Sequence, residues 1–246
     1  MRLENKVSII TGAAAGIGLA TAHLFAKEGA KVVIVDLTEE LVKGAEKEIT
    51  DKGGIAFGIV GDVTNNAAMK DLVAKVVEKF GTVDILVNNA GVTRDALSHK
   101  MTEEQWDSVI AINLKGPFNC AQAVIPIMRE KKYGKIINIS SGARFGNIGQ
   151  ANYSSTKEGV VGLTRTLAKE LGSKNINVNC VAPGFIESAM SAKVPEDILK
   201  GLIQRIPMPR QGKMDEVANV ILFFASDESA YVTGQVLDVG GGRFMP

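Results

Sequence analysis

The sequence is poor in cysteine, histidine, tryptophan and net charge, and these scarcities exclude several classes of protein. Cys120 and Cys180 are too few for a disulfide framework, and neither they nor His23 and His99 have the spacing of metal ligands. All four are interpreted as structural. The 28 basic and 27 acidic residues leave a formal charge of +1, so neither nucleic acid nor an anionic membrane is expected as a partner.

Long apolar runs are also missing. None approaches the ~20 residues that a membrane-spanning helix needs, and the amino-terminal stretch MRLENKVSIITG enters a strand-like run without the pattern of a signal peptide. With 46% apolar residues, the 246-residue chain has the size and composition of one globular domain. We therefore expect a single domain over residues 1–246, located in the cytoplasm.

Short β-branched runs alternate with longer segments of helical periodicity. Most of these runs are apolar throughout, which is typical of strands covered on both faces of a parallel sheet. The expected strands are Val7–Ile10, Lys31–Val35, Ala56–Val60, Ile85–Asn88, Lys135–Ile139, Asn177–Val181 and Gln235–Val239. The expected helices are Gly18–Lys27, Glu39–Asp51, Asn66–Phe80, Glu103–Met128, Tyr153–Leu171 and Met214–Ala225. This alternation predicts an α/β fold, a doubly wound parallel sheet of seven strands with helices on both faces.

Glycine and proline mark the less regular parts of the chain. Gly29, Gly81 and Gly172 follow expected helices, where a left-handed residue commonly ends a helix. Residues 185–213 are the least regular segment and contain Pro195. At the carboxyl edge of a parallel sheet, such a segment suits a substrate lid, with ordinary loop packing as the alternative.

The first expected strand runs into TGAAAGIG, which places Gly12, Gly16 and Gly18 in the first β–α turn. Glycines in such a turn let backbone N–H groups approach a pyrophosphate at the start of a helix. The spacing is G-x-x-x-G-x-G rather than the common G-x-G-x-x-G, and many ordinary turns collect glycine. In its strand–turn–helix context, the motif predicts a nucleotide-binding site.

The second expected strand leads into Asp36, 24 residues after Gly12. A carboxylate at this position can accept hydrogen bonds from adenosine ribose hydroxyls. It would repel a 2′-phosphate by about 1 kcal/mol per charge pair in water and about 4 kcal/mol at an effective dielectric constant of 20. The turn carries Ala14 and Ala15 and no basic residue, so NAD(H) is favoured over NADP(H). An ordinary loop acid or helix cap is the alternative.

Polar motifs follow the third and fourth expected strands as well. Asp62 and Val63 stand in GDV, and Asn89, Ala90 and Gly91 stand in NNAG. The carboxyl ends of strands are where open α/β sheets bind ligands. Asp62 is a candidate partner of the adenine amino group and NNAG of the adenosine ribose, although each motif alone is equally compatible with turn chemistry.

The stretch YSSTK places Tyr153 four residues before Lys157, so in a helix both side chains share one face. A nearby ammonium stabilises the ionised form of a phenol. The pair can therefore act as a general acid and base near neutral pH. Taken alone, a surface tyrosine beside a surface lysine would explain the same spacing.

Six motifs in this order resemble the short-chain dehydrogenase/reductase family: TGAAAGIG, NNAG, AINLKG with Asn113, INISSG, YSSTK and NCVAPGFI. The resemblance covers residues 5 to 242 and is greatest to 3-oxoacyl-[acyl-carrier-protein] reductases, through stretches such as GNIGQANYSSTK and VNCVAPGFIES. It implies a Rossmann-type sheet with strand order 3-2-1-4-5-6-7. It also implies a homotetramer whose contacts involve residues 103–128, residues 153–171 and the last strand.

The resemblance also implies the roles of individual residues. Tyr153 is expected to protonate the substrate carbonyl, Lys157 to hold the nicotinamide ribose and favour the phenolate, and Asn113 to hold a relay water in a distorted helix. The catalytic serine is expected to be Ser141 by its place after the strand, whereas counting back from the tyrosine gives Ser140. The expected cofactor-binding residues are Gly12, Gly16, Ile17, Gly18, Asp36, Asp62, Val63, Asn89, Ala90, Gly91, Tyr153, Lys157, Pro183, Gly184 and Ile186.

Basic residues bear on the partners of the chain. Lys132 and Lys174 occupy positions where some relatives carry arginines for acyl carrier protein, and solvated surface lysines are the alternative. Arg144 and Arg210 flank the expected substrate mouth and are candidates to meet an anionic substrate, although Arg144 is equally compatible with covering packed surface.

The function predicted is NADH-linked reduction of a ketone to a secondary alcohol, with a 3-oxoacyl thioester of acyl carrier protein or coenzyme A as the substrate. An NAD-dependent dehydrogenase of a small non-acyl alcohol, such as a sugar, polyol or cyclic alcohol, is the second hypothesis. A non-catalytic nucleotide-sensing scaffold is the third, and the presence of Asn113, a serine, Tyr153 and Lys157 disfavours it.

Overall fold

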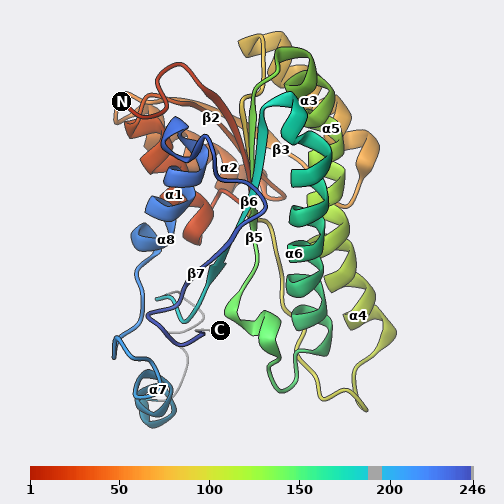
Figure 1. Ribbon diagram of the computed structural model, residues 1–246, viewed down its shortest axis with the longest axis vertical. Coiled ribbons are helices and arrows are strands. Elements are labelled where there is room, and N and C mark those ends of the chain that lie inside the picture. The colour runs from red at the N-terminus through yellow and green to blue at the C-terminus, as the bar shows by residue number, and fades with distance from the viewer. Residues whose placement is uncertain (188–195, 245–246) are drawn as a thin grey trace.

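A computed structural model describes residues 1–187 and 196–244, and its centre is one parallel sheet of seven strands (Figure 1). The strands are β1 (Val7–Thr11), β2 (Lys31–Asp36), β3 (Ile55–Val60), β4 (Ile85–Asn88), β5 (Gly134–Ile139), β6 (Ile176–Pro183) and β7 (Val236–Val239). They lie in the order β3-β2-β1-β4-β5-β6-β7. The α/β class, the parallel sheet and the strand order are therefore confirmed.

The main helices are α1 (Gly16–Lys27), α2 (Glu39–Thr50), α3 (Asn66–Phe80), α4 (Glu103–Ile110), α5 (Gly116–Lys131), α6 (Ala151–Leu171), α7 (Glu196–Ile203) and α8 (Met214–Ala225). Short helical segments are η1 (Ala111–Lys115), η2 (Gly142–Phe145), η3 (Gly172–Lys174) and η5 (Asp227–Ser229). Among the described residues, no helix is long and apolar enough to cross a membrane.

Two hydrophobic layers cover the sheet, one on each face. Alternate residues of β2 divide between them: Val33 and Val35 pack with α3, α5 and α6, and Val32 and Ile34 pack with α1, α2 and α8. Figure 1 shows these two groups of helices on opposite sides of the strands. Burial on both faces explains why the strands read as continuous apolar runs.

The single helix expected over Glu103–Met128 is wrong, because three segments occupy this stretch. α4 passes into the π-helix η1, in which the Gly116 amide bonds the Ala111 carbonyl, and α5 follows. A π-helical turn adds one residue to the hydrogen-bonded ring and often lies at a functional site. Apolar periodicity cannot reveal it, since one extra residue shifts the pattern only slightly.

Two further expectations need correction. Gly29 and Gly81 are left-handed as expected, but Gly172 has φ −57° and starts η3, so that Asn175 with φ 58° ends the helical run instead. The irregular segment 185–213 contains α7, a helix that the sequence analysis missed. Residues 188–195 of the expected lid, including Pro195, lie outside the described residues.

The chain order reverses between β1 and β4: connections from β1 lead toward β2 and β3, and those from β4 lead toward β5, β6 and β7. In an open parallel sheet, the loops at such a reversal diverge and leave a crevice beyond the carboxyl ends of the strands. This crevice is where the glycine turn, NNAG and the amino-terminal part of α6 meet.

Candidate active site

One half of the crevice is a cavity of about 730 Å³ beyond the carboxyl ends of β1, β2 and β4. This volume is within the range of small-molecule and cofactor sites. Of the expected cofactor-binding residues, it is lined by Gly12, Gly16, Asp36, Asp62, Val63, Asn89, Ala90 and Gly91. The sequence motifs that follow four separate strands thus form one surface.

The glycine turn packs closely against the end of β4. Gly12 has φ +61°, and a Cβ atom there would lie 2.9 Å from Ala90 Cα. Gly18 does not line the cavity, because it is buried behind the turn, where a Cβ would lie 2.2 Å from the Gly12 carbonyl oxygen. Gly18 therefore lets α1 pack against the turn, so its place in the motif supports the shape of the turn.

Asp36 is held at the cavity wall by two backbone donors. Its carboxylate accepts hydrogen bonds from the amides of Ala14 at 3.2 Å and Leu37 at 2.8 Å. Thr38, not Asp36, is the N-cap residue of α2, so the helix-cap alternative does not apply. No lysine or arginine lines this cavity within the described part of the chain.

The residues after β3 and β4 also make the turn contacts that the alternatives anticipated. Asp62 accepts from the backbone amide and the hydroxyl of Thr64, at 2.9 and 2.8 Å. Asn89 donates to the carbonyl oxygens of Thr11 and Gly12, at 3.0 and 2.9 Å. The Asn89 bonds fix the cavity wall, because they join the end of β4 to the glycine turn.

The other half of the crevice is a cavity of about 680 Å³ that shares Gly16, Asn89, Gly91 and Val92 with the first, so the two are continuous. Expected site residues lining it include Ile17, Ser141, Tyr153, Lys157, Pro183, Gly184 and Ile186. Because α1, the segment after β4, β5, β6 and α6 all contribute, the site exists only in the folded chain.

Tyr153 and Lys157 come from the first two turns of α6 and face this second cavity together. The Lys157 ammonium lies 5.4 Å from the centre of the Tyr153 ring and donates to the Ile139 carbonyl oxygen at 2.8 Å. Lys157 is only 4% exposed. Its charge is therefore little screened by solvent, and it acts on the phenol across a short distance.

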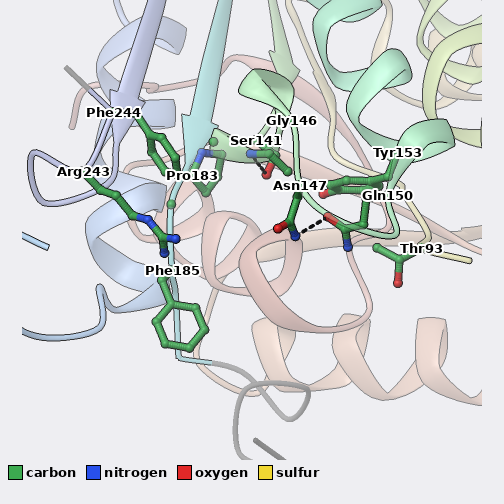
Figure 2. A pocket seen from close by; sticks show the side chains of 13 residues that line it. Thr93, Ser141, Gly146, Asn147, Gln150, Tyr153, Pro183, Phe185, Arg243 and Phe244 are labelled. Carbon is green, nitrogen blue, oxygen red and sulfur yellow. Dashed lines mark hydrogen bonds between the residues drawn. The ribbon is translucent and has the colours of Figure 1, made fainter. Parts of the chain in front are cut away.

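The two serines after β5 have different partners. Ser140 is buried and its hydroxyl donates to the Lys157 carbonyl oxygen at 2.7 Å. Ser141 accepts from the Ala143 amide at 3.1 Å, and its hydroxyl proton has no partner among the described residues. Only Ser141 can therefore offer a proton to a ligand, and both Ser141 and Tyr153 line a third cavity (Figure 2).

Asn113 lies in η1, is buried, and does not line the cavities described above. Its amide accepts from the Val92 N–H at 2.8 Å and donates to the Val92 carbonyl oxygen at 2.9 Å. The side chain thus fixes the segment after NNAG against η1.

The arginines expected to meet an anionic substrate are already paired. Arg144 makes two hydrogen bonds with Asp238, at 2.6 and 2.8 Å, and this pairing raises the pKa of its guanidinium. Arg210 makes two with Glu216, at 2.8 and 2.6 Å, and lowers the pKa of that carboxyl to about 2. Arg144 is therefore engaged within the protein, and it does not line the cavity that contains Tyr153 and Lys157.

The third cavity, about 300 Å³ in volume, contains residues that the sequence analysis did not identify. Figure 2 shows Asn147, Gln150 and Thr93 on the Tyr153 side and Arg243 with Phe244 across from them. Asn147 donates to the Gln150 side-chain oxygen at 2.9 Å. Arg243 and Phe244 follow β7, so their place beyond the carboxyl end of a strand was the signal that could have revealed them.

The cysteines show no features of a reactive site. Burial raises the pKa of the Cys120 thiol to about 12 and that of the Cys180 thiol to about 11. Both thiols are therefore protonated at neutral pH and poorly nucleophilic. Within the described ranges, no group of three histidine, cysteine or acidic residues could hold a metal ion.

Comparison with known proteins covers almost the whole chain. A family model described as enoyl-(acyl carrier protein) reductase matches residues 12–243. A 3-oxoacyl-[acyl-carrier-protein] reductase of Thermotoga maritima is 53% identical, with 98% of this chain and 99% of the relative covered. A (2S)-[(R)-hydroxy(phenyl)methyl]succinyl-CoA dehydrogenase subunit of Thauera aromatica is 48% identical over 100% of this chain and 99% of the relative. A 3-oxoacyl-[acyl-carrier-protein] reductase of Staphylococcus epidermidis is 45% identical over 98% of this chain and 100% of the relative.

Proposed function

Because the chain belongs to the short-chain dehydrogenase/reductase family, we propose that it reversibly reduces a 3-oxoacyl thioester to the 3-hydroxyacyl thioester. As a member of this family, the chain is an oxidoreductase and uses a nicotinamide cofactor. The observation that supports the proposed reaction best is the common cavity of Ser141 and Tyr153, with the buried Lys157 ammonium behind the phenol.

In the proposed reaction, the Tyr153 hydroxyl gives its proton to the substrate carbonyl oxygen, and the Ser141 hydroxyl donates a hydrogen bond to the same atom. Lys157 stabilises the phenolate that Tyr153 becomes, since an ammonium near a phenol favours its charged form. When bound, the nicotinamide cofactor supplies the hydride. Asn113 positions the loop at Val92, and the main chain of η1 is the proposed site of a relay water.

The crevice fits a dinucleotide on its own geometry. Gly12 and Gly16 have positive φ angles of 61° and 59°, and no side chain projects from the turn at either position. The start of α1 supplies unpaired amides that suit a pyrophosphate. We assign the adenosine half to Asp36, Asp62, Val63 and NNAG, and the nicotinamide half to Ile17, Tyr153, Lys157, Pro183, Gly184 and Ile186.

The preference for NAD(H) rests on Asp36. Its carboxylate lines the adenosine half, and among the described residues of that cavity no basic side chain offsets the charge. A 2′-phosphate placed there would meet like charge in a partly desolvated cleft, whereas ribose hydroxyls can donate to the carboxylate. The absence of arginine from the glycine turn agrees with this assignment.

The thioester carrier is proposed to be acyl carrier protein or coenzyme A, in line with what the relatives act on. Lys132 and Lys174 lie just before β5 and β6, at the amino-terminal edge of the sheet, while Tyr153 lies at the carboxyl edge. If these lysines hold a carrier protein, its pantetheine arm must therefore either extend from one edge of the sheet to the other or enter the active site of another copy of the chain.

A homotetramer is part of the proposal. Phe118 on α5 and Leu237 on the edge strand β7 are 45% and 43% exposed, and both lie where the family resemblance places subunit contacts. Burying such side chains in contacts between copies removes apolar surface from water. Light scattering of the purified protein should give four times the 26.1 kDa chain mass, and a monomeric mass would contradict the assembly.

The decisive experiment measures absorbance at 340 nm when the protein is mixed with a reduced nicotinamide cofactor and acetoacetyl-CoA. We expect oxidation of the cofactor. Crotonyl-CoA serves as the matched enoyl thioester, because the family model is described as an enoyl reductase. Turnover of crotonyl-CoA alone, or no turnover of any 3-oxoacyl thioester, would contradict the proposed reaction.

A further inference from the structure

Among the described residues, the lining of the cavity of about 300 Å³ carries one positive charge. Arg243 is the only one of these lining residues with an ionisable acidic or basic side chain other than the Tyr153 phenol. In the part of the chain that the structure describes, no aspartate or glutamate lines this cavity. A guanidinium is charged at any pH the protein meets, so the cavity presents a permanent cation to its occupant.

Arg243 also lacks a partner of its own. Arg144 and Arg210 are each bound by a carboxylate, whereas the Arg243 guanidinium has no ion pair or side-chain hydrogen bond within the described part of the chain. The guanidinium carbon lies 5.3 Å from the centre of the Phe244 ring. A half-buried guanidinium without an anion leaves five donors available, in a geometry that matches a carboxylate.

The carboxy-terminal residues hold Arg243 in place. The Phe244 ring fits against Gly142 so closely that a Cβ there would lie 2.0 Å from it, and it stacks on Phe145 with 5.8 Å between ring centres. The Arg243 amide donates to the Gly240 carbonyl oxygen at 3.1 Å. The backbone of Arg243 is therefore anchored on both sides, which lowers the cost of ordering its side chain on a ligand.

The cavity that Arg243 lines also contains Ser141 and Tyr153, which are proposed to bind the reacting carbonyl (Figure 2). The cavity volume lies at the small end of the range for ligand pockets. An anion held by Arg243 and a carbonyl held by Ser141 and Tyr153 would therefore share one small space. The phosphates of a pantetheine carrier lie beyond the far end of a long arm, so the acyl group is the better source of the anion.

We propose that Arg243 is a specificity-determining residue that binds a carboxylate on the acyl part of the substrate. The preferred substrate is then a 3-oxoacyl thioester with a second, free carboxylate, or the corresponding 3-hydroxy compound. This inference rests on the proposed function and narrows it from 3-oxoacyl thioesters in general to those of dicarboxylic acids.

The test compares 3-oxoadipyl-CoA with 3-oxohexanoyl-CoA, which have the same six-carbon chain and differ by the terminal carboxylate. We expect wild-type kcat/KM to be at least tenfold higher for the carboxylated thioester, since charge-assisted pairs are the stronger hydrogen bonds. In Arg243→Gln this ratio should fall at least tenfold, mainly through a higher KM for the carboxylated thioester. Arg243→Lys should restore part of the ratio, because it keeps the charge and loses the fork.

A matched control is Arg165→Gln, which removes one charge from an exposed position of α6 and should leave the ratio at its wild-type value. Repeating the comparison with pantetheine thioesters, which lack phosphate, separates the two sources of an anion. A preference that persists supports the acyl carboxylate. If Arg243 binds the carrier phosphate instead, Arg243→Gln should lower kcat/KM equally for both CoA thioesters and leave both pantetheine thioesters unaffected, and that result would overturn the inference.

The two proposals fail in different ways. Equal wild-type turnover of the two thioesters, or an unchanged ratio in Arg243→Gln, would overturn the role of Arg243 and leave the proposed reaction intact. No cofactor oxidation with either thioester, or with acetoacetyl-CoA, would overturn the reaction itself and the inference with it.

Discussion

The hydroxyl of Ser140 donates to the carbonyl oxygen of Lys157 at 2.7 Å, and this bond joins the end of β5 to α6. The Lys157 ammonium returns to the same strand, donating to the Ile139 carbonyl oxygen at 2.8 Å. Strand and helix are therefore tied at two points beneath the Tyr153 ring. Ser140 supports the site without offering its proton to a ligand, while Ser141 keeps its proton available.

Replacing each serine by alanine should affect activity at one position and stability at the other. Ser141→Ala should lower kcat about 10- to 1,000-fold with little change in the free energy of unfolding, because it removes a donor aimed at the reacting oxygen. Ser140→Ala should reduce the free energy of unfolding by about 1 kcal/mol, the usual net value of such a bond. Urea unfolding measures the free energy of unfolding of each variant, and steady-state kinetics measure kcat. A large loss of kcat in Ser140→Ala, with a loss of stability in Ser141→Ala, would exchange the two roles.

Tyr153→Phe should abolish most turnover while leaving the cofactor bound. Loss of a general acid typically lowers kcat by a factor of ~100 to 10,000. Phenylalanine keeps the ring beside Lys157 and removes only the hydroxyl. Stopped-flow kinetics give the rate, and fluorescence titration with NADH gives the dissociation constant; unaltered turnover would exclude Tyr153 as the proton donor.

Asp36→Ala should shift coenzyme preference toward NADPH. Removing the carboxylate eliminates a repulsion of about 1 to 4 kcal/mol with a 2′-phosphate, depending on the local dielectric constant, and removes a partner of the ribose hydroxyls. The ratio of kcat/KM for NADH over NADPH should therefore fall at least fivefold. Leu37→Ala serves as a control on the same cavity wall, and a wild-type enzyme that prefers NADPH would contradict the charge argument.

The buried thiols should make the protein less stable at alkaline pH. Their pKa values are raised in the folded state, to about 12 for Cys120 and about 11 for Cys180, so the unfolded chain loses these protons first. As the pH rises from about 9 to the folded pKa of each thiol, the contribution of that thiol to the free energy of unfolding should fall by up to ~1.4 kcal/mol per pH unit. The stability contribution is complete below pH 8.

Urea titrations at pH 8, 9 and 10 check this expectation. A variant with both Cys120→Ala and Cys180→Ala should show a shallower decline than the wild type over the same interval. In addition, native protein at pH 8 should resist iodoacetamide and react after unfolding. Equal declines in the two proteins would show that the thiols do not contribute.

Several features of the fold follow from the local sequence. Continuous apolar runs such as KVVIVD predicted strands buried on both faces, and the observed strands begin and end within two residues of the expected limits. Helix α3 has the expected limits, Asn66–Phe80, because Asn65 caps its first turn and the left-handed Gly81 ends it. Signals of this kind involve residues that are close together in the sequence, so they can be recognised before the fold is known.

The π-helix and the role of Gly18 required three-dimensional contacts. The π-helical turn occurs where Asn113 must reach Val92, 21 residues earlier in the chain, and no local pattern encodes that bond. Gly18 belongs to a motif that indicates nucleotide binding, yet its neighbours are the Gly12 carbonyl and Asn89. A motif shows which residues gather in a turn and not which of them face the ligand.

By itself, the sequence determined the order of strands and helices, the glycine turn, the acid after β2 and the one-turn spacing of Tyr153 and Lys157. Only the tertiary structure decided which cations remain available to a ligand. Arg144 is paired with Asp238, 94 residues away in the sequence. Arg243, near the carboxyl terminus, lines the substrate cavity and has no ion-pair partner among the described residues. The physical reason is that charge pairing depends on distance in space, which chain folding sets, while periodicity and turn chemistry depend on neighbours along the chain.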